Sequence, residues 1–421
     1  MLDLNGLKGF NMARKILFIQ CANSMFKRHD SCDYYWDAFY NCWEHIGYYM
    51  GKHVFEIPKW VAEIAYFLTE DDKELFYCEN DAYEAINKII GGDYDYVMMS
   101  LMNANQFIIR NIVSRCYNQK FIIGGYNDAF MADMADEFDN VEICSDTIEV
   151  ANRLDVEYRF GTDYSLFVGE RVIPRLTMSY GCLNNCKFCI VPHGSITPVD
   201  NSVIEQQVRS FEPIDYRLIY IDDKTYGQCA NYGYTKEMAK LTGKKDFNGF
   251  IVQTTTGMLY QKANEFVDVG VRVAEIGLET YNDSILRKYR KPSSEAMTVK
   301  AVDACYNCGL YLIANVIIGL PEETEETYQR TYDYVMPLIE SGKLIGINPA
   351  IYTDYDNEQN LGEIDFLDDG KTDLHRKWWD KFNNTAADIL TTHRNYRSGY
   401  YVITNQKVKN EFEALWKKGW L

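Results

Sequence analysis

The chain has 421 residues, of which 47% are apolar and 25% are charged, so its composition excludes a fibrous or fully disordered protein. Its formal net charge of −18 disfavours a surface that grips nucleic acid, because phosphate binding requires an excess of lysine and arginine. No run of about 20 apolar residues and no export signal is visible, so we expect a cytoplasmic protein that does not enter membranes.

The first part of the chain alternates short apolar segments with amphipathic ones. After the first strand, a stripe at helical spacing holds Tyr35, Phe39 and Cys42. The predicted strands are residues 15–20, 54–57, 94–101, 121–125 and 141–144. This alternation predicts an α/β domain over residues 1–156, Rossmann-like and doubly wound, whose ligands bind at the carboxyl ends of the strands.

A second alternation begins near Arg175. Its predicted strands are residues 175–179, 217–221, 249–254, 272–279, 312–318 and 344–352. Six consecutive βα units predict a partial (β/α)6 barrel over residues 157–352, with its chemistry at the C-terminal strand ends. Residues 353–421 lose the pattern, and we expect an extension that packs on the barrel and buries Trp378 and Trp379.

Three of the twelve cysteines are closely spaced. Residues 180–193 read YGCLNNCKFCIVPH, which places Cys182, Cys186 and Cys189 in a C-x3-C-x2-C pattern after the first barrel strand. Three thiolates on one loop can ligate three irons of a [4Fe–4S] cluster and leave the fourth iron open to a small chelator. A zinc site completed by His193 is the alternative that this spacing leaves open.

Three segments together resemble the radical S-adenosylmethionine (SAM) superfamily, over about residues 174–352. They are the cysteine loop, the run IGLETYNDSILRKYR at residues 276–290 and the run IIGLPEET at residues 317–324. The resemblance is closest to the branch that contains methylthiotransferases and cobalamin-domain radical SAM enzymes. It implies reductive cleavage of SAM to a 5′-deoxyadenosyl radical, for C–H functionalisation of a small-molecule or nucleotide substrate. A flavodoxin or ferredoxin would supply the electron.

The resemblance also implies roles for residues at the strand ends, beyond the three cysteine ligands. Phe188 would lie beside the adenine of SAM. Asp222 or Asp223 would accept hydrogen bonds from the SAM amino group, since a carboxylate suits an ammonium. Glu279 would meet the ribose or the amino-acid portion of SAM.

A cation is expected for the SAM carboxylate. Arg290 has the bidentate fork for it, and its neighbours Lys288 and Lys291 are alternatives. The remaining contacts with the ribose and adenine would come from Gln253, Thr255, Gly319 and Pro321. No side chain is assigned to the chemical step itself.

The N-terminal domain departs from the patterns of this branch. Methylthiotransferases carry a second cluster on three cysteines, of which only Cys21 is present here. His29 does not stand in the D-x-H-x-x-G motif of cobalamin proteins, although the expected sheet leaves cobalamin binding open. The alternatives to the radical chemistry above are therefore a cobalamin-dependent methyltransferase, methylthiotransferase-like RNA modification, and a non-catalytic zinc or scaffold protein.

Overall fold

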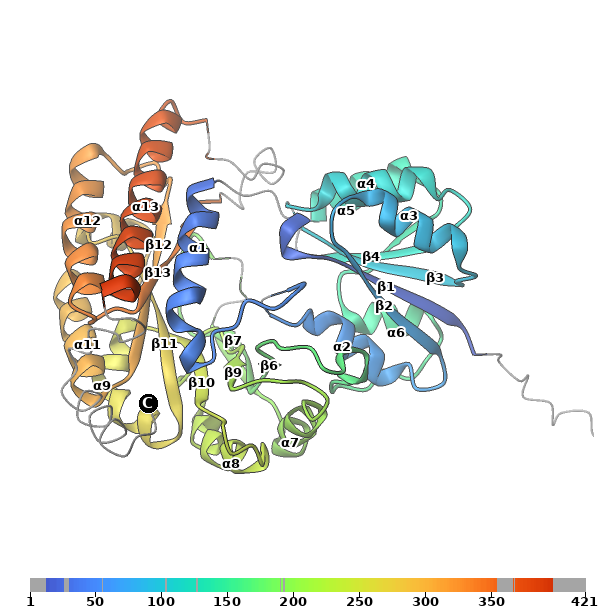
Figure 1. The fold of residues 1–421 in the computed structure, drawn as a ribbon, viewed down its shortest axis with the longest axis horizontal. Helices are drawn as coiled ribbons and strands as arrows, with labels where there is room; N and C mark the ends of the chain where they lie inside the picture. The colour runs from blue at the N-terminus through green and yellow to red at the C-terminus, as the bar shows by residue number, and fades with distance from the viewer. Residues whose placement is uncertain are drawn as a thin grey trace, which may run out of the picture. The chain divides into compact units, whose positions relative to one another are not determined.

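The computed structural model describes residues 13–25, 30–54, 56–102, 104–125, 128–189, 191, 194–353, 366 and 368–396. The chain divides into two compact units (Figure 1). The first unit comprises Met1–Phe26 and Pro58–Leu166, and the second comprises Lys27–Ile57 and Phe167–Leu421. Each unit is built on a parallel sheet, which confirms the predicted α/β class.

The first unit is a five-stranded parallel sheet in the order β2-β1-β3-β4-β5. Its strands are β1 (Lys15–Cys21), β2 (Asp72–Cys78), β3 (Tyr96–Leu101), β4 (Phe121–Gly125) and β5 (Val141–Ile143). The helices are α2 (Lys59–Phe67), α3 (Ala82–Gly91), α4 (Gln106–Arg115), α5 (Asp128–Glu137) and α6 (Thr147–Arg153). The strand order reverses between β1 and β3, which is the switch point where doubly wound sheets bind ligands.

The predicted strand at residues 54–57 is wrong. In its place β2 pairs with β1, and residues 54–57 belong to the second unit, where Glu56 forms a single bridge with Ile173. The sequence of β2, DKELFYC, lacks a continuous apolar run because β2 is an edge strand and is only partly buried. A search for buried apolar runs therefore does not predict β2.

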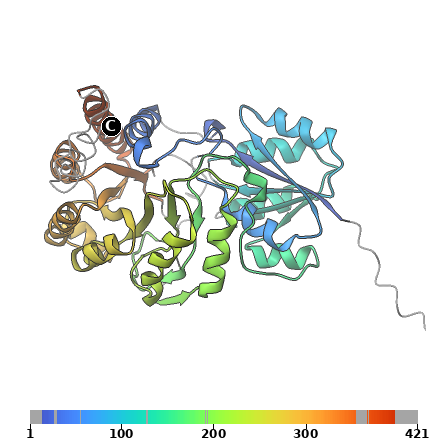
Figure 2. The same ribbon diagram turned by 60° about the horizontal axis from the view of Figure 1, so that its bottom comes forward.

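The second unit holds a six-stranded parallel sheet, in the order β13-β12-β11-β10-β9-β6. Its strands are β6 (Arg175–Leu176), β9 (Leu218–Ile221), β10 (Gly249–Thr254), β11 (Val271–Glu279), β12 (Tyr311–Ile318) and β13 (Gly346–Ile351). The intervening helices are α7 (Asn201–Ser210), α8 (Thr235–Leu241), α9 (Thr256–Asp268), α10 (Asp283–Lys288), α11 (Glu295–Cys308) and α12 (Glu325–Glu340). Helices α9, α11 and α12 lie on one side of the strands (Figures 1 and 2). Strand order follows chain order, as the predicted partial barrel requires.

The first barrel strand is shorter than predicted. After β6 the chain enters an antiparallel hairpin of β7 (Ser179–Cys182) and β8 (Ser195–Pro198), which carries the cysteine loop. The predicted strand over residues 175–179 is thus divided between a parallel and an antiparallel sheet.

Helix α1 (Asp30–Trp43) belongs to the second unit, although the sequence pattern placed it in the N-terminal domain. The Tyr35 hydroxyl donates to the Ile347 carbonyl oxygen (2.5 Å) and accepts from the Ile347 N–H (2.8 Å). Trp43 Nε1 donates to the Ile345 carbonyl oxygen (2.8 Å). Side chains of α1 therefore pair backbone groups at the open edge of the sheet.

The C-terminal extension packs on the barrel as predicted, through α13 (Thr372–Tyr396). This helix packs beside α12 and α1 (Figure 1). The Ser31 hydroxyl of α1 donates to Asp380 Oδ1 (2.6 Å). Trp378 and Trp379 are both buried, which confirms them as core residues. The last part of the predicted extension, residues 397–421, lies outside the described residues.

A search of the described helices finds none with the length and apolar character of a membrane span.

Candidate active site

The hairpin fixes the start and end of the cysteine loop. The Gly194 N–H donates to the Cys182 carbonyl oxygen (2.8 Å), and the Cys189 N–H donates to the Cys186 carbonyl oxygen (3.2 Å). Gly181 has a φ of +86°, and a Cβ there would lie 2.3 Å from the Ser195 carbonyl oxygen. Only glycine therefore allows the two strands to approach in this way beside the first cysteine.

The three thiols of the loop are free of disulfide bonds and share one environment. Cys182 is 8% exposed and Cys186 is 7% exposed, while Cys189 is more accessible. Burial raises the pKa of the Cys186 thiol to about 11, against the opposing effect of the nearby Lys291 ammonium. Glu279 and the other two cysteines raise this pKa further, so all five groups lie within electrostatic reach of one another.

Three cysteines on one loop keep the predicted [4Fe–4S] cluster and the zinc alternative as the two hypotheses for this site. Among the described residues, no three His, Cys, Asp or Glu side chains converge on a position that could hold one metal ion. A tetrahedral zinc site would hold its thiolates about 4 Å apart. In a [4Fe–4S] site each thiolate binds a different iron, so the three cysteines of one loop can each take one iron. His193 lies outside the described residues.

Glu279 and Lys291 form a buried ion pair beside the loop, with 2.5 Å between Oε1 and Nζ. Their side chains are 7% and 11% exposed. Burial opposes the charge on Lys291, but Glu279 and then Cys186 and Cys189 outweigh it, so the pKa of Lys291 is raised. A Cβ on Gly277 would lie 2.1 Å from the Lys291 nitrogen and 2.3 Å from Glu279 Oε1, so the ion pair lies directly against this glycine.

Glu279 reaches this position through an irregular backbone. The register of β11 with β12 shifts between Gly277 and Glu279, and Glu279 has a φ of +61°. A non-glycine residue in the left-handed region costs about 1–3 kcal/mol and is common at functional sites. The end of β11 is therefore strained at Glu279, the residue that the resemblance to the superfamily assigns to SAM binding.

The structure separates the three cations proposed for the SAM carboxylate. Arg290 is exposed, with a φ of +54° that ends the helical segment, and Lys288 forms an ion pair with Glu322. Lys291 is the cation that faces the cysteine loop, and its nitrogen lies 5.6 Å from the centre of the Phe188 ring. The change of backbone direction at Arg290, which sequence spacing does not reveal, decides this choice.

Phe188 packs on the barrel rather than into solvent. Its ring centre lies 5.9 Å from that of Tyr289, and it contacts the apolar cluster that includes Ile285, Ile317 and Leu320. The Lys187 N–H donates to the Tyr289 carbonyl oxygen (3.0 Å). These contacts attach the cysteine loop to α10 and to the end of β12.

Asp223 holds the strand that carries the first cysteine. It is 3% exposed and accepts hydrogen bonds from the Met178 N–H (2.9 Å), the Ser179 N–H (2.8 Å) and the Ser179 hydroxyl (2.6 Å). Burial raises its pKa, although these hydrogen bonds act in the opposite direction. Asp222 forms ion pairs with Arg175 (3.0 Å) and Lys224 (3.5 Å). Both carboxylates therefore have partners within the protein.

The other polar strand ends have structural partners as well. The Thr255 hydroxyl accepts the Met258 N–H (3.3 Å) and caps α9. Gln253 Nε2 donates to Glu275 Oε2 (3.2 Å), which also accepts the Tyr220 hydroxyl (2.9 Å). The sequence analysis did not select Glu275. The signal that could have identified it is a carboxylate in the middle of the apolar strand VRVAEIGLE.

The turn after β12 approaches the same end of the sheet. Gly319 has a φ of +102°, and its N–H donates to the Tyr328 hydroxyl (2.8 Å). The Pro321 carbonyl oxygen accepts from Lys371 Nζ (2.5 Å). Glu323 is buried, and burial raises its pKa.

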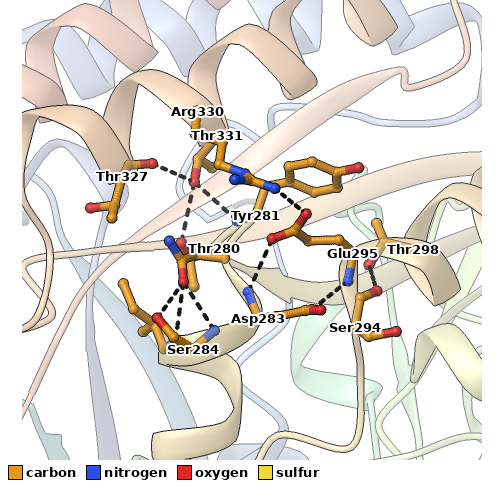
Figure 3. A network of polar contacts seen from close by, with 12 residues as sticks. Thr280, Tyr281, Asp283, Ser284, Ser294, Glu295, Thr298, Thr327, Arg330 and Thr331 are labelled. Atoms are coloured by element: carbon orange, nitrogen blue, oxygen red, sulfur yellow. Dashed lines mark hydrogen bonds and ion pairs between the residues drawn. The ribbon is translucent and has the colours of Figure 1, made fainter.

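A network of polar contacts braces the segment that follows β11 (Figure 3). The Tyr281 N–H donates to the Thr331 hydroxyl (3.0 Å), which lies 3.2 Å from the Thr280 hydroxyl. The Asp283 N–H donates to Glu295 (3.2 Å), and the Glu295 N–H donates to Asp283 (2.8 Å). The strained end of β11 is thus fixed to α11 and α12.

Comparison with known proteins identifies the barrel. Residues 176–335 match the sequence model of the radical SAM superfamily. This range contains the cysteine loop, Glu279, Lys291 and the Gly319 turn, so the predicted resemblance is confirmed.

A curated relative and two solved structures extend the comparison. The tRNA-2-methylthio-N(6)-dimethylallyladenosine synthase of Fusobacterium nucleatum is 27% identical over 203 residues, which are 44% of each chain. The cobalamin-dependent SAM radical enzyme OxsB, with aqua-cobalamin and SAM bound, has a TM-score of 0.55 at 10% identity, covering 93% of this chain and 63% of that one. The radical SAM methyltransferase TsrM of Kitasatospora setae has a TM-score of 0.55 at 12% identity, covering 85% and 80%. These two likenesses show a shared fold.

Proposed function

Because the chain carries the domain of the radical SAM superfamily, we propose that it is an enzyme that cleaves SAM reductively at a [4Fe–4S] cluster held by Cys182, Cys186 and Cys189. When bound, the cluster supplies the electron that splits SAM into methionine and a 5′-deoxyadenosyl radical for hydrogen abstraction from a substrate. The observation that carries the proposal is the placement of the three thiols beside the buried Glu279–Lys291 pair.

The protein's own groups would bind and orient SAM. The Lys291 ammonium suits the SAM carboxylate, and the Glu279 carboxylate suits the SAM amino group, since charged hydrogen bonds are the strong ones. Phe188 and the turn from Gly319 to Pro321 would contact the adenine. This replaces Arg290 with Lys291 and leaves Asp223 as a support of the cysteine loop.

The proposal is tested by anaerobic reconstitution with iron and sulfide, followed by incubation with SAM and dithionite. We expect about four irons per chain and the release of 5′-deoxyadenosine, measured by mass spectrometry. A protein that takes up stoichiometric zinc, binds no SAM and stays colourless would support the scaffold alternative instead.

Glu275 is our candidate for a substrate contact. It lies two residues before Gly277 on β11, ahead of the irregular backbone at Glu279, so Glu275 and Gly277 share one face of the sheet. Oε2 accepts two hydrogen bonds, whereas Oε1 accepts none from the part of the chain that the structure describes. Burial raises the pKa of Glu275, because desolvation disfavours its ionised form. Such groups are functional candidates.

Replacing Glu275 with glutamine is expected to stabilise the fold while lowering substrate turnover about tenfold, the loss of one hydrogen bond to a charged group. A raised folded-state pKa means that stability falls as the pH rises from about 5 through that pKa, because the unfolded chain ionises more easily. The gain in the variant should therefore be larger at pH 8 than at pH 5, measured by urea unfolding. A variant that is equally stable at both pH values and equally active would remove this assignment.

A cobalamin-dependent methyltransferase is the second candidate. The observation in its favour is the sheet order of the first unit, β2-β1-β3-β4-β5, with its switch point between β1 and β3. OxsB and TsrM, which share the fold, are solved with cobalamin bound. Stoichiometric cobalt after reconstitution, with S-adenosylhomocysteine formed beside 5′-deoxyadenosine, would favour this candidate.

Methylthiotransferase-like RNA modification has less support. Cys21 ends β1 and pairs in register with Cys78, and burial, then Cys78, raises the pKa of Cys21 to about 12. Two buried thiols do not make the three ligands of a second cluster. The chain spans less than half the length of the curated relatives it matches, so their RNA substrates are not transferred to it.

For the cellular setting, we propose the cytoplasm and a flavodoxin or ferredoxin as reductant. All twelve cysteines are free thiols, as in reducing compartments.

A further inference from the structure

A chain of buried hydrogen bonds supports the turn from Gly319 to Glu323 from behind. The Gly319 N–H donates to the Tyr328 hydroxyl oxygen (2.8 Å), and the same oxygen lies 2.7 Å from His375 Nδ1. The other ring nitrogen, Nε2, lies 3.2 Å from Asp369 Oδ2. Tyr328 and His375 are fully buried, so these groups depend on one another for hydrogen bonding.

One arrangement of protons satisfies all the hydrogen bonds from Gly319 through Tyr328 and His375 to Asp369. Burial raises the pKa of Tyr328, so the phenol keeps its proton and, having accepted the Gly319 N–H, donates to His375 Nδ1. The ring proton then lies on Nε2 and faces Asp369. Burial alone would raise the pKa of Asp369, but the hydrogen bonds from His375 and the Lys371 N–H outweigh it and lower the pKa.

Two residues of the segment before α13, Lys371 and Phe366, also approach the turn. Lys371 Nζ donates to the carbonyl oxygens of Pro321 (2.5 Å) and Glu323 (3.1 Å). A Cβ on Gly319 would lie 3.0 Å from the ring of Phe366. Residues before and within α13 therefore hold the turn through its backbone at several points.

We propose that Tyr328, oriented by His375 and Asp369, is a positioning residue that fixes the Gly319 turn for binding the adenosine part of SAM. The inference rests on the proposed function, in which this turn lies beside the adenine. A glycine at a φ of +102° has no local preference strong enough to hold one conformation, because glycine populates many. The buried phenol supplies the missing constraint, and the C-terminal helix thereby contributes to nucleoside affinity.

The test measures nucleoside binding to the cluster-loaded protein by anaerobic calorimetry, with S-adenosylhomocysteine and 5′-methylthioadenosine as probes. The second probe lacks the amino-acid portion and reports on the nucleoside contacts alone. Tyr328→Phe should weaken both probes about tenfold, because the Gly319 N–H loses its buried acceptor, while the iron content stays unchanged. His375→Leu should weaken both similarly, whereas His375→Asn, which keeps an acceptor for the phenol, should remain within about threefold of the native affinity.

Tyr332→Phe is the matched control. Tyr332 lies on the same helix and loses a comparable hydrogen bond, 3.0 Å to the Thr385 hydroxyl, without contact to the turn. Its affinity should equal that of the native protein. Native affinity in Tyr328→Phe, an equal loss in Tyr332→Phe, or no difference between the two His375 variants would overturn the inference. Native protein that loads a cluster but binds neither probe would instead overturn the proposed function on which it rests.

Discussion

Replacing Cys186 with alanine is expected to abolish both the iron–sulfur cluster and the cleavage of SAM. Cys186 is buried, and the Cys182 and Cys189 thiols and the Lys291 ammonium lie within electrostatic reach of it, so alanine would remove one of the three proposed ligands. Iron should fall from about four per chain to below one, and 5′-deoxyadenosine should become undetectable. The measurements are iron and sulfide analysis after anaerobic reconstitution, with product detection by mass spectrometry.

Two further variants separate ligation from packing. Cys189→Ala removes a more accessible thiol at little cost to the core and should lose the cluster as completely. Cys229→Ala removes a buried cysteine of the same unit outside the triplet and should keep both cluster and activity. A Cys186→Ala protein that still holds four irons and cleaves SAM would refute the ligand assignment.

Replacing Lys291 with methionine is expected to lower the free energy of unfolding by about 3 kcal/mol, because it leaves the Glu279 carboxylate buried without its partner. Glu279→Gln should destabilise the protein to a similar extent, since it leaves the ammonium unpaired. The double variant removes both charges and should recover most of this loss. Anaerobic urea unfolding of the apoprotein measures all three effects.

Activity should not follow stability in this series. If the pair binds the amino-acid portion of SAM, all three variants lose SAM cleavage, including the double variant that regains stability. Arg290→Ala, at the exposed neighbouring position, is the control and should keep both stability and cleavage. A double variant that is stable and still cleaves SAM would show that the pair has only a structural role.

The sequence was sufficient for the parts of the site whose members are close along the chain. The resemblance to the radical SAM superfamily, which the comparison confirmed, was predicted from short segments. These are the loop of Cys182, Cys186 and Cys189 and the runs around Glu279 and Gly319. A short loop brings its residues together in almost any fold. The alternation of apolar segments likewise predicted the two parallel sheets. A central strand of such a sheet is buried on both faces, so its sequence is a nearly continuous apolar run.

Long-range packing decided what the sequence did not show. Helix α1 carries an apolar stripe that would suit either unit. Its place is explained by backbone groups at the edge of the second sheet: Tyr35 pairs Ile347 of β13, and Trp43 pairs Ile345 just before β13. The edge strand β2 was missed because it is only partly buried and so lacks the apolar run of a central strand.

Within the candidate site, too, local sequence predicted some features and long-range packing decided others. The sequence alone predicted that three cysteines, a glutamate and a cation lie near the strand ends of the barrel, because the strand and loop boundaries indicate those positions. The tertiary structure decided which cation faces the cysteines, since the positive φ of Arg290 turns the chain so that Lys291 pairs with Glu279. It also decided that Asp223 supports the loop and that His375, over 50 residues after Gly319, orients the turn. Burial and hydrogen bonding between distant residues depend on where the whole chain packs, and no local pattern records them.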